Sequence, residues 1–247
     1  MTTEEKQSLV TDDETLWNVL IYMAADNNLK EECVYALTEI EKAGITPGIR
    51  IVAQLDSGDA INRFDFSKLK AAKGFSQLVT RRTNTILKAI NGQEGSQSDE
   101  IRQKILSDKN AQSDSKMLGE FLSETIIEGH NMVVLSGHGS GAVGDFLGDD
   151  KSPSSLSIPT LKSVLESVRE QIGHKINVLG MDSCLMSMVE VCYELRDQVE
   201  FLVGAEGFER NAGWPYLEIV KVLQANMKAL KDDPQTALKE IVRQIVR

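Results

Sequence analysis

The amino-acid sequence predicts an α/β fold in which helices cover both faces of a mostly parallel central sheet. Three observations support this prediction: short apolar segments with the composition of buried strands, helical patterns that separate most of them, and polar residues directly after each strand. Strands and helices that alternate at these lengths are joined by right-handed crossovers, which produce a parallel sheet covered on both faces.

Five apolar segments are predicted to form the strands. Each is short and nearly continuous, as expected for a strand that is buried on both faces of a sheet. The segments are WNVLIYM (17–23), IRIVAQL (49–55), NMVVLS (131–136), KINVLGM (175–181) and EFLVGA (200–205).

Helical patterns lie between the predicted strands. Apolar residues recur along one face of segment 27–44 and of segment 113–129. Segment 157–173 begins with Ser157, which is a favourable N-cap residue. The last pattern, 184–196, begins directly after the fourth strand, so its first residue is expected at a helix N-terminus.

Residues 56–98 depart from this alternation. The segments FDF (64–66) and FSQLVT (75–80) could pair as a small hairpin, and the polar run NGQEGSQSDE (91–100) has the composition of a surface loop. No motif in this region indicates a function.

The domain organisation is predicted to be simple. We find no internal repeat and no linker, so we expect one domain over residues 17–247 after a flexible N-terminal segment, residues 1–16. The helical pattern over 238–247 has no stop signal, which predicts that the natural chain continues into a further C-terminal part.

Composition limits the classes of partner. The chain has 37 acidic and 27 basic residues and a formal net charge of −10, a field that repels nucleic acid. No apolar run approaches the ~20 residues that span a bilayer. Three cysteines do not make a disulfide framework, and the polar N-terminus has no signal peptide, so we expect no membrane partner and a cytoplasmic location. A chain trimmed of a leader could instead be secreted, and the oligomeric state stays open.

Residues that follow the strands are candidates for chemistry, because ligands of parallel sheets bind outside the carboxyl ends of the strands. Acidic, histidine and cysteine residues all fall at this edge. The segments are AADNN (24–28), DSGD (56–59), GHGSG (137–141), DSC (182–184) and EGFERNAGW (206–214).

The third of these segments contains Gly139-x-Gly141-x-x-Gly144, the glycine spacing of a dinucleotide-binding loop. That interpretation also requires a helix that begins within the loop and an acidic residue after the next strand. The glycines instead lead into a turn-rich segment, DFLGDDKSPSSLS (145–157). A nucleotide-binding protein is therefore a weak alternative.

His138 and Cys184 form the stronger candidate pair. His138 lies between glycines at the end of a strand, and Cys184 follows the next predicted strand. If these two strands are neighbours, their ends lie ~5 Å apart, and a thiol at a helix N-terminus beside an imidazole is activated as a nucleophile. The alternative for Cys184 is a buried small apolar residue, the role that we expect of Cys33 and Cys192. His130 and His174 are expected to be structural.

At these residues the sequence resembles the clostripain family of cysteine peptidases, within the wider caspase-like clan. The segments SGHG and MDSCLMS resemble the catalytic segments of the family, and WNVLIYMAADNNL and AEGFERNAGWPY are similar to its first strand and to the segment after the strand that follows the cysteine. The matching segments run from about residue 17 to 216 in the order of the family. The resemblance implies a caspase-like three-layer sandwich.

The resemblance also implies roles for individual residues. Cys184 matches the nucleophile and His138 the catalytic histidine, while the backbone N–H groups of Gly139 and Cys184 would form the oxyanion hole. Asp182 matches the residue at the base of the primary specificity pocket, where a carboxylate would bind the Arg or Lys side chain after which the family cleaves. A helix-capping role for Asp182 is the alternative.

Further expectations concern the loops. Glu206 and Trp214 are expected to line the substrate cleft, with a core position as the alternative for Trp214. Self-cleavage, which activates members of the family, is expected at Lys151. Asp145, Asp149 and Asp150 form an acidic cluster without EF-hand spacing, so Ca²⁺ is a conceivable ligand but no metal site is assigned.

The sequence thus predicts a cysteine endopeptidase that hydrolyses peptide bonds after Arg or Lys through an acyl-enzyme, without a required cofactor. Its partners would be peptides or proteins with a basic residue before the cleaved bond. The alternative from another class is a latent caspase-like domain that binds or regulates without cleaving.

Overall fold

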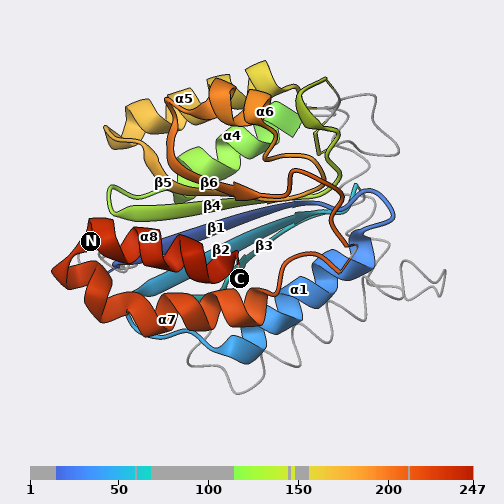
Figure 1. The fold of residues 1–247 in the computed structure, drawn as a ribbon. Coiled ribbons are helices and arrows are strands. Elements are labelled where there is room, and N and C mark those ends of the chain that lie inside the picture. Colours follow the sequence, from blue (N-terminus) through green and yellow to red (C-terminus); the bar gives the residue numbers. More distant parts are fainter. Residues whose placement is uncertain are drawn as a thin grey trace, which may run out of the picture.

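The computed structural model describes residues 15–58, 60–67, 114–143, 146–147, 156–210 and 212–246. Within them, a six-stranded sheet has the order β3–β2–β1–β4–β5–β6 (Figure 1). β3 pairs antiparallel with β2, and the other neighbouring strands are parallel. The strands are β1 (Trp17–Ala24), β2 (Ile49–Asp56), β3 (Ile61–Asp65), β4 (His130–Ser136), β5 (Ile176–Asp182) and β6 (Val199–Gly204).

Helices cover both faces of this sheet (Figure 1). On one face lie α1 (Lys30–Ala43), α7 (Tyr216–Asp232) and α8 (Pro234–Ile245); on the other lie α4 (Asp114–Thr125), α5 (Ile158–Ile172) and α6 (Val189–Leu195). A short 3-10 helix, η3 (Gly141–Val143), follows β4. In the described part of the chain, no helix combines the length and the apolar character required to cross a membrane.

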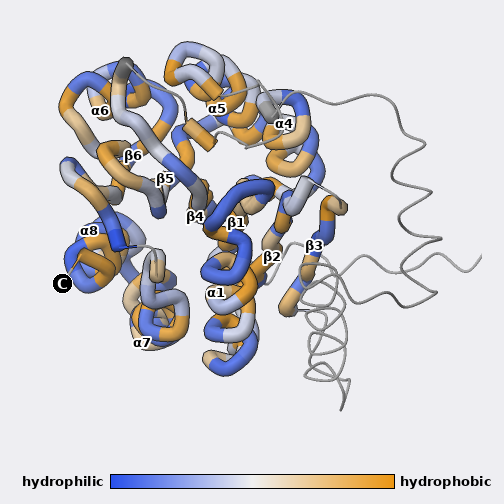
Figure 2. Tube along the Cα trace, turned by 90° about the vertical axis from the view of Figure 1, so that its right-hand side faces the viewer, coloured by the Kyte–Doolittle hydropathy of each residue, from blue (hydrophilic) through white to orange (hydrophobic). Residues whose placement is uncertain are grey.

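Two apolar cores hold the layers together, and β1 contributes to both. Trp17 and Ile21 pack in the core under α1, α7 and α8, whereas Leu20 and Tyr22 pack in the core under α4 and α5. Because successive side chains of a strand point to opposite faces, a strand between two helical layers must be apolar at nearly every position. The helices, in contrast, carry both hydrophobic and hydrophilic residues along their length, as Figure 2 shows.

Three buried asparagines connect β1, β4 and β5 near the N-terminal ends of these strands. The Asn18 side-chain amide donates to Oδ1 of Asn131 at 2.9 Å, and the Asn131 backbone N–H donates to Oδ1 of Asn177 at 2.9 Å. All three residues are buried, so a slip of one residue in either pairing would leave amide groups without partners in the interior. The asparagines therefore help to fix the register that aligns the opposite ends of the strands.

The predicted fold class is confirmed, and each of the five predicted strands is present within one residue of its expected ends. Helices α1, α4 and α5 are also confirmed, and the Ser157 hydroxyl accepts from the Thr160 N–H at the start of α5. The segment FDF differs from its prediction, because it contributes to β3, which pairs with β2. Its expected partner, residues 75–80, lies outside the described residues, as do residues 1–14.

The helix predicted over 184–196 is wrong at its start: Cys184–Ser187 form turns, and α6 begins only at Val189. The backbone N–H groups of Leu185 and Ser187 donate to carbonyls of Gly207 and Ala205, after β6, and Met186 is fully buried. These tertiary contacts replace the hydrogen bonds of a first helical turn.

Phe121 of α4 is expected to be a main contributor to stability. Its ring is fully buried, with its centroid 6.1 Å from that of Tyr22. Replacement by Ala should leave a cavity and lower the free energy of unfolding by about 3–5 kcal/mol, as measured by urea denaturation. Phe208, which is 88% exposed, is the matched control, and Phe208→Ala should change this energy by less than about 0.5 kcal/mol. Equal losses in the two variants would contradict the assignment of the core.

Candidate active site

The carboxyl ends of β4 and β5 bring two of the predicted segments side by side. The strands are parallel neighbours, and Ser136 and Asp182 are opposite each other at their ends. Beyond them, the Gly137 N–H still donates to the Asp182 carbonyl at 3.3 Å. The two strands are therefore neighbours, as the pairing of His138 with Cys184 requires, and the loops that carry these residues leave the sheet next to each other.

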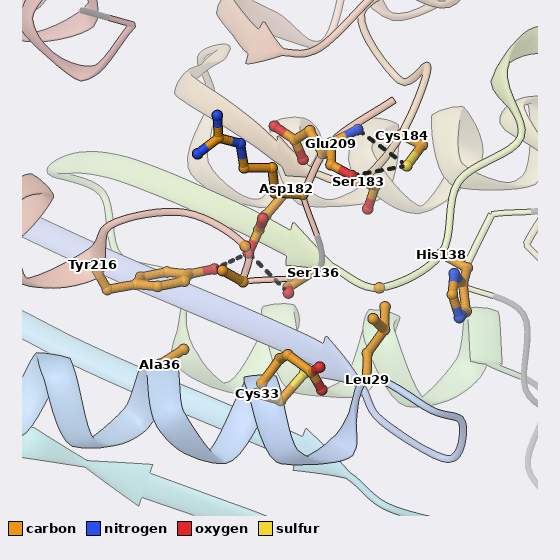
Figure 3. Close-up of a pocket in the computed structure, with 15 residues that line it drawn as sticks. Leu29, Cys33, Ala36, Ser136, His138, Asp182, Ser183, Cys184, Glu209 and Tyr216 are labelled. Carbon is orange, nitrogen blue, oxygen red and sulfur yellow. Dashed lines mark hydrogen bonds between the residues drawn. The ribbon is translucent and has the colours of Figure 1, made fainter. Parts of the chain in front are cut away.

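A cavity opens at this edge of the sheet (Figure 3). Its walls come from α1, from the ends of β4 and β5, and from the segment that connects β6 to α7. The predicted residues His138, Asp182 and Cys184 all line it. The remaining lining residues are Leu29, Glu32, Cys33, Ala36, Ser136, Gly137, Ser183, Glu209, Arg210, Ala212, Gly213 and Tyr216.

Asp182 forms the buried base of this cavity. Its Oδ2 accepts from the Tyr216 hydroxyl at 2.8 Å and from the Ser136 hydroxyl at 3.0 Å (Figure 3). Burial raises the pKa of the carboxyl group, and the two hydroxyl donors oppose that shift. Gly213 lies directly against the carboxylate, because a Cβ at that position would be 3.2 Å from Oδ2. Asp182 lies in β5 and caps no helix, so the alternative of a capping role is excluded.

Glu209 is a second acidic residue of the cavity, and no sequence motif pointed to it. Burial raises the pKa of its carboxyl group to about 7, although a hydrogen bond from the Trp214 indole N–H acts to lower this pKa. That bond is 3.0 Å long and reaches Oε1. Glu206, which was predicted instead, is exposed and is not among the residues that line the cavity. The acid that enters the cavity is thus three residues further along the same segment.

Trp214 takes the core position that was its alternative. Its ring is 9% exposed and packs beneath β5, where a Cβ on Gly180 would approach it to 2.8 Å. It is not among the residues that line the cavity, and its indole N–H donates to Glu209. Trp214 therefore orients an acidic side chain of the cavity.

The cavity is acidic and has free hydrogen-bonding capacity. Among the described residues, Oε2 of Glu209, Oε2 of Glu32 and Oγ of Ser183 are buried atoms without a hydrogen-bond partner. Together with Asp182, three carboxyl groups line the cavity, and the only Lys or Arg side chain among its lining residues is the exposed Arg210. Buried acceptors without a partner cost free energy, which a bound donor would recover.

Cys184 occupies a strained turn at the rim. The next residue, Leu185, has φ 63°, a left-handed conformation that side chains with a Cβ adopt at a cost. The Cys184 Sγ is partly buried and accepts from the Glu209 backbone N–H at 3.3 Å. The thiol therefore receives an N–H from the neighbouring segment, and the predicted activation by a helix N-terminus is wrong.

His138 is exposed, and its Nε2 lies 2.6 Å from Oδ1 of Asn28, in the loop between β1 and α1. The imidazole and the Cys184 thiol line the same cavity but point in different directions (Figure 3). Each is hydrogen-bonded to another group. Gly139 passes close to the cysteine: a Cβ at Gly139 would be 2.4 Å from the Cys184 carbonyl oxygen, so any side chain there would push the two loops apart.

Several predicted residues lie outside the described part of the chain. These are Lys151, the expected self-cleavage site, and the acidic residues Asp145, Asp149 and Asp150. Within the residues that the structure describes, no group of three or more His, Cys, Asp or Glu side chains has the arrangement of a metal site.

Comparison with solved structures shows a shared fold. A secreted C11 cysteine protease from Bacteroides thetaiotaomicron, solved in complex with an irreversible peptide inhibitor, is 18% identical with a TM-score of 0.59; the match covers 92% of this chain and 58% of that one. Iotapain, a secreted C11 cysteine protease from the same organism, is 16% identical with a TM-score of 0.49, over 85% of this chain and 57% of that one. An inactive zymogen of a C11 protease from Parabacteroides distasonis is 20% identical with a TM-score of 0.46; the match covers 85% of this chain and 54% of that one.

This chain thus spans less than two thirds of the length of each of these three proteins. No curated protein matches it. A sequence model of the clostripain family, peptidase family C11, matches residues 21–247, nearly the whole chain. The chain therefore belongs to the clostripain family.

Proposed function

We propose that this protein is a cysteine endopeptidase that hydrolyses peptide bonds after Arg or Lys. The observation that carries the proposal is the acidic cavity directly beside the Cys184 thiol, with Asp182 at its base. Membership of the clostripain family and a fold shared with a C11 cysteine protease support it.

In the proposed reaction, His138 takes the proton of the Cys184 thiol, and the thiolate attacks the carbonyl carbon of the peptide bond. The backbone N–H groups of Gly139 and Cys184 would stabilise the oxyanion. When the C–N bond breaks, the imidazolium gives its proton to the leaving amine, and a thioester remains. His138 then takes a proton from water, whose hydroxide hydrolyses the thioester and restores the thiol.

This reaction requires a change at the rim of the cavity. The thiol must turn from the Glu209 N–H toward the scissile carbonyl and toward the imidazole, which is held by Asn28. The present hydrogen bonds of the thiol and the imidazole to other groups favour a second candidate function, a latent domain that binds basic peptides without cleaving them. Self-cleavage at Lys151 belongs to the proposal as a route to the active arrangement, and Ca²⁺ as an optional ligand that the reaction does not require.

The preference for a basic side chain follows from charge. A guanidinium or ammonium group that enters the cavity would meet Asp182, Glu209 and Glu32, and it would supply donors to the two glutamate oxygens that have no partner. Charge-assisted hydrogen bonds of this kind are stronger than neutral ones. An acidic side chain in the same position would be repelled.

Cys184→Ala should abolish cleavage, because the reaction has no other nucleophile. Fluorogenic peptides that end in Arg, Lys, Asp or Ala, assayed with and without Ca²⁺, should be cleaved only after Arg and Lys, and kcat/KM should fall by more than about a thousandfold in the variant. Cys192→Ala is the matched control, since that thiol is also partly exposed but does not line the cavity. Binding of an Arg peptide without cleavage, in folded protein, would favour the latent domain.

Asp182→Asn should weaken recognition of the basic side chain. Loss of one charge-assisted hydrogen bond is worth about 1.5–3 kcal/mol, so kcat/KM for an Arg peptide should fall roughly ten- to hundredfold. Thermal denaturation of the variant checks that the buried network with Ser136 and Tyr216 survives. Glu206→Gln, on an exposed carboxyl outside the cavity, should leave kcat/KM within about twofold. Equal effects of the two substitutions would argue against Asp182 as the specificity residue.

Glu209 should make the binding of basic peptides depend on pH. Its pKa of about 7 means that the carboxyl is neutral below this pH and charged above it. KM for an Arg peptide should therefore fall as the pH rises from about 6 to 8. In Glu209→Gln this part of the pH dependence should disappear. An unchanged pH profile in the variant would remove Glu209 from the binding site.

A further inference from the structure

We propose that Asn28 is the positioning residue for His138: it holds the imidazole by Nε2 and leaves Nδ1 as the nitrogen that exchanges protons during the reaction. The observation is the 2.6 Å contact between Nε2 of His138 and Oδ1 of Asn28. This inference rests on the proposed function, because it assigns a role within the proposed peptidase reaction.

The backbone on the asparagine side of the contact is fixed. The Ala25 N–H donates to the Asp56 carbonyl at 2.7 Å, which ties the loop to the end of β2. Within the loop, the Asn27 side chain accepts from the Leu29 N–H at 2.9 Å and donates to the Ala24 carbonyl at 3.1 Å. Asn27 thus shapes the turn, and Asn28 is the next residue, immediately before that turn closes.

The backbone on the histidine side is fixed as well. The Gly137 N–H donates to the Asp182 carbonyl, and the His138 carbonyl accepts from the Leu147 N–H at 2.9 Å. β1 and β4 are parallel neighbours, with Met23 opposite Ser136, so the loops beyond them emerge side by side. The side-chain contact therefore joins two anchored segments that are distant in the sequence.

The chemistry of the contact determines which nitrogen is free. A side-chain carbonyl oxygen can only accept a hydrogen bond, so Nε2 of His138 must carry the proton. In the neutral ring the lone pair is then on Nδ1. When Nδ1 takes a proton from the thiol, the imidazolium keeps its Nε2–H bond to Asn28.

Exposure explains why the ring needs such a partner. His138 is exposed in this structure, and an exposed imidazole without a fixed neighbour samples several rotamers. A positioned general base loses much of its effect when it is displaced by about 1 Å. Asn28 would reduce the number of orientations before a substrate covers the ring.

The test combines two substitutions. Asn28→Ala removes the acceptor, and kcat for an Arg peptide should fall roughly ten- to hundredfold while KM stays within about twofold. Asn28→Asp keeps an acceptor oxygen and should recover most of that loss. Asn226→Ala, which removes a hydrogen-bonding asparagine from α7, is the matched control and should leave kcat unchanged.

A second measurement does not depend on activity. In Cys184→Ala protein, the ring signals of His138, assigned from the spectrum of His138→Gln, are followed by NMR as the pH changes. Asn28→Asp should move the midpoint of this titration to higher pH by about one unit, because a carboxylate at Nε2 favours the imidazolium.

The outcomes separate the two proposals. A parent chain that cleaves Arg peptides, with unchanged kcat in Asn28→Ala or an unchanged midpoint in Asn28→Asp, overturns the role of Asn28. A parent chain that cleaves no peptide overturns the proposed function, and the titration alone then decides whether Asn28 holds the ring.

Discussion

The register between parallel strands is the constraint on which the site depends. β4 and β5 pair so that Ser136 and Asp182 are opposite each other, and the segments with His138 and Cys184 begin immediately beyond. A slip of one residue would exchange the two faces of a strand and turn its core side chains toward the wrong helices. Because both faces are buried in apolar cores, such a slip is strongly unfavourable, and the positions of the loop residues follow from the packing of the layers.

The asparagine network supports this constraint at the other end of the same strands. Apolar packing is non-directional and tolerates small shifts, whereas a buried amide is satisfied in only one register. Asn18, Asn131 and Asn177 occupy equivalent positions near the start of β1, β4 and β5 and bond to one another across the sheet. The precision of the cavity thus originates in part from polar groups at the far edge of the molecule.

The acidic groups of the cavity lower the stability of the empty protein but favour the binding of a cation. Three carboxyl groups converge in it, burial raises the pKa of two of them, and two of its glutamate oxygens lack a partner. Such an arrangement disfavours the empty state and favours a cation. The thiol and the imidazole are each hydrogen-bonded to other groups, so the fold presents the parts of the site before the reactive geometry is assembled.

Local sequence patterns were sufficient to predict the sheet, its helical layers and the edge at which polar residues gather. Short continuous apolar runs that alternate with helical patterns favour buried parallel strands, and the residues that follow parallel strands meet at one edge of the sheet. This is why His138, Asp182 and Cys184 could be assigned to one site in advance. Local patterns carry this information, because burial on both faces leaves little freedom in composition.

The side chains that complete the site depend on contacts between segments that are distant in the sequence. Glu209 rather than Glu206 enters the cavity because the segment after β6 turns to bond with Leu185 and Ser187, and the same bonds prevent a helix at Cys184. Glu32 and Asn28 reach the site from α1 and the loop before it, about a hundred residues from the histidine or more. Contacts of this kind depend on how separate loops are oriented in space, a property that no local sequence pattern encodes.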